Sequence, residues 1–128
     1  MSGSTKLFFD GGLRPAGMEL AVVVGGRVHL QCDLGPGTSM EAEWRALIAA
    51  AGLAVRLDMA GAVLLGDAAA VIAQASGRVR VPPAYRALAE TYRAIPRFRL
   101  RYIRRAQNLA GIALERVHGG RQPFAPLD

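Results

Sequence analysis

The stretch Lys6-Leu7-Phe8-Phe9-Asp10-Gly11-Gly12 joins an apolar run to a carboxylate and two glycines. The apolar run predicts a buried β-strand over residues 6–10. The glycine pair predicts a turn directly after Asp10, because glycine accepts backbone conformations that other residues avoid. Asp10 is therefore expected where a buried strand ends, which makes its carboxylate a candidate metal ligand.

Two further acids occur in comparable settings. Glu43 lies inside the amphipathic stretch 38–55, and Asp67 follows the apolar run 62–66. Each of the three acids is thus carried by a regular element. We expect their carboxylates to converge on one site.

The rest of the pattern predicts an α/β fold with a mixed five-stranded sheet flanked by helices. Three strands form an antiparallel meander, and strands then alternate with helices in the order βββαβα(α)βα. The predicted strands cover residues 6–10, 18–24, 27–32, 62–65 and 98–102, and the predicted helices cover residues 38–55, 68–75, 85–92 and 109–117. In a sheet of this order the first and fourth strands can lie side by side.

Length and composition indicate one folded domain. The chain has 128 residues, of which 52% are hydrophobic and 20% charged, and this balance excludes a disordered chain. Its apolar runs are far shorter than the roughly 20 residues that span a bilayer. We expect a single domain over residues 1–118 and a flexible tail over residues 119–128.

The single cysteine, Cys32, cannot form an internal disulfide, and the first residues carry no basic region followed by an apolar core. These features favour the cytoplasm. We expect Cys32 to be packed in the interior. We expect no membrane association and infer no obligate protein partner.

The chain is strongly basic, with 16 Lys and Arg against 10 Asp and Glu and a net charge of +6. This balance favours a phosphate-rich partner. A GC-rich genome, which encodes many Arg and Ala residues, would give the same composition. Composition alone leaves both interpretations open.

Three converging carboxylates need positive charge. Two carboxylates about 4 Å apart repel each other by roughly 4 kcal/mol at an effective dielectric constant of about 20, so the group requires a cation or raised pKa values. Oxygen ligands without neighbouring His or Cys indicate Mg²⁺ or Mn²⁺ rather than zinc. Two such ions roughly 4 Å apart are the usual means of cutting a phosphodiester.

Each acid also has an ordinary structural interpretation. Asp10 before two glycines could be a turn carboxylate, Asp67 could be a helix N-cap, and Glu43 could lie on a solvated helix face. Glu41 is two residues from Glu43 and points elsewhere, so it is expected to interact with the helix dipole. The metal hypothesis therefore depends on the set.

Three segments together resemble the ribonuclease H family, in particular its compact ribonuclease H-like domains. Asp10-Gly11-Gly12 with Arg14-Pro15 is similar to the family's Asp-Gly-Gly-Ser-Arg motif, and residues 38–47 are similar to its Thr-Asn-Asn-x-Ala-Glu-Tyr-x-Ala-Leu helix. Gly66-Asp67 with Val71 and Gln74 is similar to its Gly-Asp-Ser-x-x-Val-x-x-Gln segment. The resemblance extends over residues 6–115.

The resemblance implies that Asp10, Glu43 and Asp67 are three of four metal-binding catalytic carboxylates. The fourth is replaced, because Ile112 stands where the family's last-helix motif, Asn-x-x-Ala-Asp-x-Leu, has Asp. Glu115, one turn further on, is a possible substitute ligand, and Asn108 could offer a neutral oxygen. In the family the first and last acids hold the metal that activates water, so this loss is expected to impair activation more than binding.

Other departures from the family pattern concern substrate handling. Ser39-Met40 replaces Asn-Asn, Ala68 replaces Ser, and no His precedes the last helix. Only the short connection 77–83 occupies the place of a basic helical handle, so we expect a modest grip on the substrate.

We predict nucleic-acid contacts from the motif residues and from arginines in two loops. These residues are Gly11, Gly12, Arg14, Thr38, Ser39, Arg78, Arg80, Arg104 and Arg105. Arg97, Arg99 and Arg101 alternate along the predicted fifth strand and could extend a phosphate track. Alternatively, these three arginines protect an edge strand from aggregation.

The leading hypothesis is a Mg²⁺- or Mn²⁺-dependent endonuclease that cuts the RNA strand of RNA/DNA hybrids. The rival is a catalytically inactive nucleic-acid-binding module of the same fold. A third interpretation is a structural α/β domain without a nucleic-acid role. Ile112 is the residue that separates the first two hypotheses.

Overall fold

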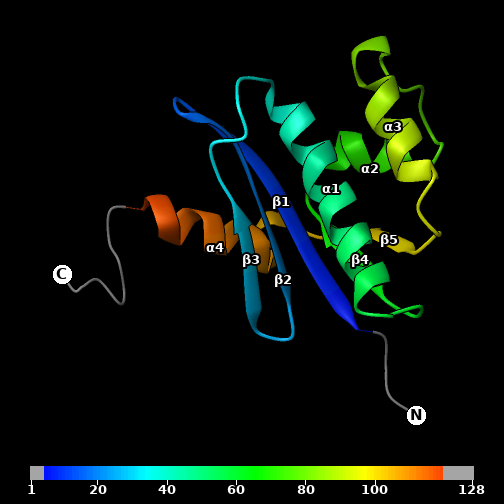
Figure 1. The fold of residues 1–128 in the computed structure, drawn as a ribbon, viewed down its shortest axis with the longest axis horizontal. Coiled ribbons are helices and arrows are strands. Elements are labelled where there is room, and N and C mark those ends of the chain that lie inside the picture. The colour runs from blue at the N-terminus through cyan, green and yellow to red at the C-terminus, as the bar shows by residue number, and fades with distance from the viewer. Residues whose placement is uncertain (1–4, 120–128) are drawn as a thin grey trace.

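The fold is one mixed sheet with helices on both faces, shown by a computed structural model that describes residues 5–119 (Figure 1). The strands are β1 (Lys6–Arg14), β2 (Gly17–Val24), β3 (Arg27–Gln31), β4 (Val63–Gly66) and β5 (Arg99–Tyr102). The α-helices are α1 (Ser39–Arg56), α2 (Ala69–Ala75), α3 (Arg86–Arg93) and α4 (Leu109–His118), and the short 3-10 turns are η1 (Pro83–Tyr85) and η2 (Arg105–Gln107). The predicted fold class is confirmed.

The strands follow the spatial order β3-β2-β1-β4-β5. β1, β2 and β3 form the predicted antiparallel meander, while β1 pairs with β4, and β4 with β5, in parallel. The predicted adjacency of the first and fourth strands is therefore confirmed. It places the residues that follow β4 beside the middle of β1.

The predicted turn after Asp10 is wrong. β1 continues through Gly11 and Gly12 to Arg14, and Asp10 lies in mid-strand opposite Ala21 of β2. The chain reverses later, before Gly17, whose φ of 135° few other residues adopt. Gly11 instead allows a close approach, because a Cβ there would lie 2.1 Å from the carbonyl oxygen of Ala42 in α1.

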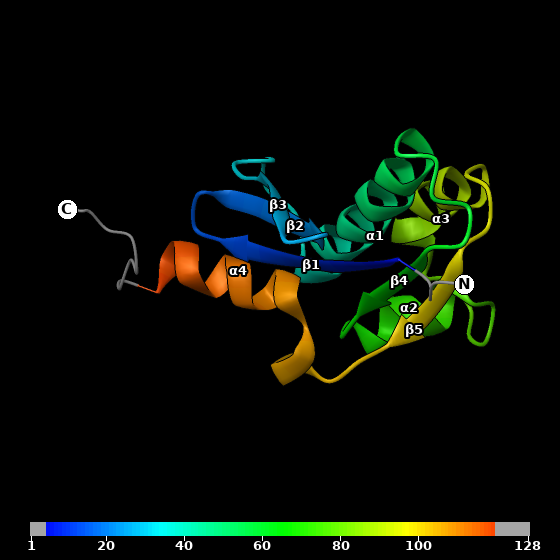
Figure 2. The ribbon, with the colours of Figure 1, turned by 90° about the horizontal axis from the view of Figure 1, so that it is seen from below.

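The two faces of the sheet have separate apolar clusters. On one face, Leu7 and Phe9 pack with α1, α2 and α3 around Trp44, which is fully buried. On the other face, Ala21 and Val23 pack against Ala110 and Leu114 of α4. Figure 2 shows α1 and α4 on opposite sides of β1. β1 is thus covered on both faces, which holds its side chains in fixed positions.

Helix α1 begins at a well-formed cap. The Thr38 hydroxyl accepts a hydrogen bond from the Glu41 amide at 3.0 Å, and this satisfies one of the free amides of the first turn. Further along, the indole of buried Trp44 donates to the Gln74 side chain of α2 at 3.1 Å. The cap and the indole fix the rotation of α1, and therefore the direction in which Glu43 leaves the helix.

Three further sequence predictions concern Cys32, membrane spans and the C-terminal tail. Cys32 is exposed just beyond β3, so its predicted burial is wrong: it follows a strand at the edge of the sheet. Within residues 5–119 no helix has the length and apolarity needed to cross a membrane. Of the predicted flexible tail, residues 119–128, all but Gly119 lie outside the described residues.

Replacing Gly11 by alanine should destabilise the fold. The added Cβ would overlap the Ala42 carbonyl at 2.1 Å, and forcing atoms into a packed interior costs about 1 to 3 kcal/mol. Urea unfolding followed by circular dichroism would measure the loss. Gly12→Ala is the matched control, because its Cβ meets only Glu19 at 3.6 Å; equal effects of both changes would show that α1 is free to move away.

Candidate carboxylate site

Asp10 points to the face of the sheet that α4 covers. Leu7 and Phe9 face α1, so the alternation of β1 sends Asp10 to the opposite side. Helix α4 approaches closely there, since a Cβ on Gly111 would lie 3.4 Å from Asp10 Oδ2. The carboxylate is thus half-buried between a strand and a helix.

Asp67 reaches the same place from β4. Phe8 pairs with Leu65, so Asp67, two residues further, lies level with Asp10 on the parallel neighbour. Its predicted alternative role as a helix N-cap is wrong, because the N-cap of α2 is Ala68 and no side chain caps that helix. Asp67 Oδ1 instead accepts a hydrogen bond from Asn108 Nδ2 at 2.8 Å.

Glu43 is the third acid and comes from α1. It is half-buried, in contrast to a solvated helix position. Burial, and then the nearby charge of Asp67, raise the pKa of Glu43 above its usual value. Glu41 pairs with Arg45 at 2.8 Å on the exposed side of the helix, so it takes no part in the site.

The crowding of negative charge is strongest at Asp10. Burial and then the nearby Asp67 raise the pKa of Asp10 from 3.8 to about 7, with a smaller contribution from Glu43 and a side-chain hydrogen bond with Asp67. The Arg105 guanidinium opposes this rise. The three predicted carboxylates are therefore close enough to act on one another electrically.

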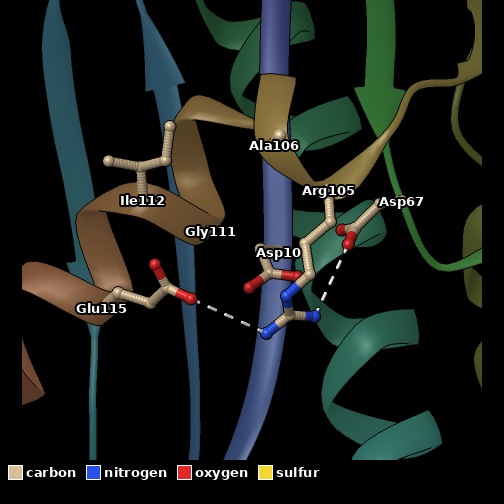
Figure 3. A pocket seen from close by; sticks show the side chains of 7 residues that line it. All are labelled: Asp10, Asp67, Arg105, Ala106, Gly111, Ile112 and Glu115. Atoms are coloured by element: carbon tan, nitrogen blue, oxygen red, sulfur yellow. Dashed lines mark ion pairs between the residues drawn. The ribbon is translucent and has the colours of Figure 1, made fainter.

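A cavity of about 340 Å³ opens beside these acids. It is lined by Asp10, Asp67, Arg105, Ala106, Gly111, Ile112 and Glu115. Figure 3 shows these side chains converging from β1, from the end of β4, and from the segment that carries η2 and α4. Asp10 and Asp67 form the acidic floor of this cavity.

Asn108 has no oxygen to offer a metal. Its Oδ1 accepts from the Ala110 amide at 3.1 Å as the N-cap of α4, and its Nδ2 donates to the Phe9 carbonyl and to Asp67. The side chain is fully buried. The alternative that Asn108 replaces the lost carboxylate is therefore wrong, because Asn108 instead ties α4 to β1 and to Asp67.

Ile112 lines the cavity where the resemblance expects a fourth acid. Figure 3 shows its side chain directed away from the Asp10 carboxylate. Glu115, the possible substitute, lines the same cavity from the next turn of α4, and its side chain is 66% exposed. Because its side chain is a hydrocarbon, Ile112 provides no oxygen ligand where the resemblance expects a carboxylate.

Arg105 has a position that the sequence did not reveal. One nitrogen of its guanidinium lies 3.6 Å from Asp67 Oδ2, and the other lies 4.0 Å from Glu115 Oε2 (Figure 3). The sequence predicted only a phosphate contact for this residue. No spacing signal links it to Asp67, because the two meet only through the parallel pairing of β4 and β5.

The donor chemistry fits a hard divalent cation at Asp10 and Asp67. These are oxygen donors carried by neighbouring strands, and burial, followed by the nearby charge of Asp67, raises the pKa of Asp10 to about 7. Within residues 5–119, however, no group of three or more His, Cys, Asp or Glu side chains is arranged to hold a metal ion. The complete three-acid ligand set remains a prediction.

The predicted nucleic-acid contacts fall into two groups. Gly11 is buried against α1, Arg14 pairs with Glu19 at 3.2 Å, and the Thr38 hydroxyl shares a hydrogen bond with Tyr85 at 2.8 Å. Gly12 is partly buried. The other predicted contact residues are exposed; these are Ser39, Arg78, Arg80, Arg104 and Arg105. The β5 arginines 99 and 101 are exposed on an edge strand, as both of their interpretations require.

Solved structures of RNase H proteins have folds similar to this chain. The N-terminal RNase H domain of a Mycobacterium tuberculosis protein is 28% identical, with a TM-score of 0.72 over 87% of this chain and 95% of that domain. RNase H1 from the archaeon Halobacterium salinarum is 24% identical, with a TM-score of 0.74 over 92% of this chain and 100% of that protein.

A third similar structure comes from a compost metagenome. LC11-RNase H1, solved in complex with an RNA/DNA hybrid, is 21% identical, with a TM-score of 0.67 over 82% of this chain and 88% of that protein. A scan of protein-family models and a search of curated sequences found no match. The structural likenesses show a ribonuclease H-like domain.

The raised pKa of Asp10 predicts a stability that falls as pH rises. Between the unfolded value near 3.8 and the folded value of about 7, the folded protein holds a proton that the unfolded chain has lost, so stability declines across this window. Asp10→Asn removes this loss, so its free energy of unfolding at pH 8 should exceed that of the wild type by on the order of 2 to 4 kcal/mol.

Urea unfolding from pH 4 to pH 8 would test this prediction. The advantage of Asp10→Asn should shrink toward pH 4, where the carboxyl of the unfolded wild-type chain begins to regain its proton. Asp58→Asn, a change at an exposed turn, should follow the wild type throughout. Parallel curves for wild type and Asp10→Asn would contradict the burial and charge crowding of the Asp10 carboxylate.

Proposed function

We propose that this ribonuclease H-like domain binds RNA/DNA hybrids and cleaves their RNA strand slowly, with Mg²⁺ or Mn²⁺ held by Asp10, Glu43 and Asp67. The observation that carries the proposal is the crowding of these carboxylates in a half-buried position beside one cavity, where burial and then the neighbouring acids raise the pKa of Asp10 to about 7. A fold does not need such crowding, and it is unfavourable without a cation. Perturbed acids beside a cavity are typical of functional sites.

The choice of substrate rests on the likeness to solved structures. One of them, LC11-RNase H1, was solved in complex with an RNA/DNA hybrid. The net charge of +6 suits a polyanion. The exposed basic residues of the predicted set, Arg78, Arg80 and Arg104, would contact phosphates, and such contacts read helix shape rather than base sequence.

The protein's own groups divide the work around the cation. When bound, the cation would supply Lewis-acid polarisation of a phosphoryl oxygen and stabilise charge on the leaving oxygen. Asp10 and Asp67 would hold it from neighbouring strands, and Glu43 would add a carboxylate from α1. Asp10 must give up its proton to bind, so affinity should rise with pH up to about 7.

The wall formed by α4 explains why the reaction should be slow. Ile112 offers no oxygen to a second cation or to an attacking water. Glu115 is the proposed substitute, but its side chain is exposed and its carboxylate lies near Arg105. The loss of the fourth acid therefore impairs water activation more than it impairs cation binding, in agreement with the expectation from the sequence.

A second candidate function has its own support. Ile112 in the cavity, together with Arg105 beside Asp67, favours a catalytically inactive domain that binds nucleic acid without cutting it. The two functions share the fold and the basic surface. They differ only in whether the RNA strand is broken.

Cleavage of a hybrid with end-labelled RNA in Mn²⁺ tests the proposal. We expect slow cutting by the wild type and none by Asp10→Asn, which loses a charged ligand. Ile112→Asp restores an acid to the open wall and should raise the rate by on the order of tenfold or more, equivalent to about 1.4 kcal/mol in the barrier.

The controls separate the two candidate functions. Asp58→Asn changes an exposed acid away from the cavity and should cut like the wild type. Uncut RNA with both wild type and Ile112→Asp, combined with salt-sensitive binding of the hybrid, would establish the inactive binding module instead.

A further inference from the structure

The guanidinium of Arg105 is a positive charge inside the carboxylate cavity. It lies 3.6 Å from Asp67 Oδ2 and 4.0 Å from Glu115 Oε2, so it bridges the two walls of the cavity (Figure 3). Asp67 Oδ1 is already engaged by Asn108 at 2.8 Å. Arg105 therefore lies beside the oxygen of Asp67 that Asn108 does not engage.

The charge of Arg105 acts on the whole acidic group. It opposes the rise in pKa of both Asp10 and Glu43. A single side chain thus partly compensates acids from β1, α1 and the end of β4. This is the electrostatic task that a divalent cation would also perform.

Arg105 is held loosely. Its side chain is 76% exposed, and both carboxylate contacts are longer than the 2.7–2.9 Å typical of a charge-assisted hydrogen bond. It sits on the short turn η2 (Arg105–Gln107). Exposed pairs of this kind contribute little to stability, so the guanidinium can be displaced at small cost.

We propose that Arg105 is a built-in counter-ion that competes with divalent cations for the carboxylate cavity. It compensates the acids while no metal is bound, and it must leave Asp67 before a metal can use that oxygen. The protein should accordingly bind Mg²⁺ or Mn²⁺ more weakly than its carboxylates alone would. This inference rests on the metal-binding part of the proposed function.

Calorimetric titration of the full chain with Mn²⁺ at pH 8 tests the competition. Arg105→Gln removes the competing charge but keeps a polar side chain, and should tighten Mn²⁺ binding by on the order of tenfold. Arg105→Lys keeps the charge without the two-pronged geometry and should fall between Arg105→Gln and the wild type. Thermal unfolding should show the same order, with the largest Mn²⁺-induced rise in Tm for Arg105→Gln.

Arg93→Gln is the matched control, because it removes one positive charge from the exposed surface of α3. It should bind Mn²⁺ like the wild type, which separates a local effect from net charge. Asp10→Asn should abolish the binding heat and so locate the ion in the cavity.

Two results would overturn the inference in different ways. Equal or weaker Mn²⁺ binding by Arg105→Gln, with wild-type binding intact, rejects the competition alone. An absence of Mn²⁺ binding and of any thermal shift in all variants, each folded by circular dichroism, rejects the metal site together with it.

Discussion

The close packing of α1 against β1 at Gly11 is the constraint from which the site follows. A side chain at this position would overlap the backbone of Ala42, so only glycine lets the helix lie this near the strand. The residue before it, Asp10, and the residue after Ala42, Glu43, are thereby fixed relative to each other. A dense interior then prevents either backbone from relaxing when their charges repel.

The site responds to this enforced proximity in three ways. The pKa of Asp10 rises to about 7, Arg105 supplies a positive charge that partly compensates the acids, and Asn108 donates a hydrogen bond to Asp67. Asn108 is the most structural of these, because it also bonds the Phe9 carbonyl and caps α4. The network that stabilises the carboxylates is therefore the one that docks the last helix.

Sequence patterns predicted the parts of this molecule that depend on periodicity. The meander and the adjacency of β1 and β4 follow from apolar runs and their order. The predicted turn at Gly11 is wrong, because a glycine that lets a helix pack closely against a strand cannot be told from a turn glycine by its neighbours in sequence. Arg105 was assigned to phosphate alone, since its contacts depend on strand pairing between segments about 40 residues apart in sequence.

Packing does not require isoleucine at the fourth acid position. Within residues 5–119, Ile112 belongs to neither apolar cluster, while its neighbours Ala110 and Leu114 hold α4 against β2. The docking of the helix and the chemistry of its cavity wall are thus carried by different residues. A domain can lose the fourth carboxylate and keep its fold, its three remaining acids and the strain of their mutual repulsion. That retained repulsion is unfavourable for a purely structural domain, and the proposed cation would relieve it.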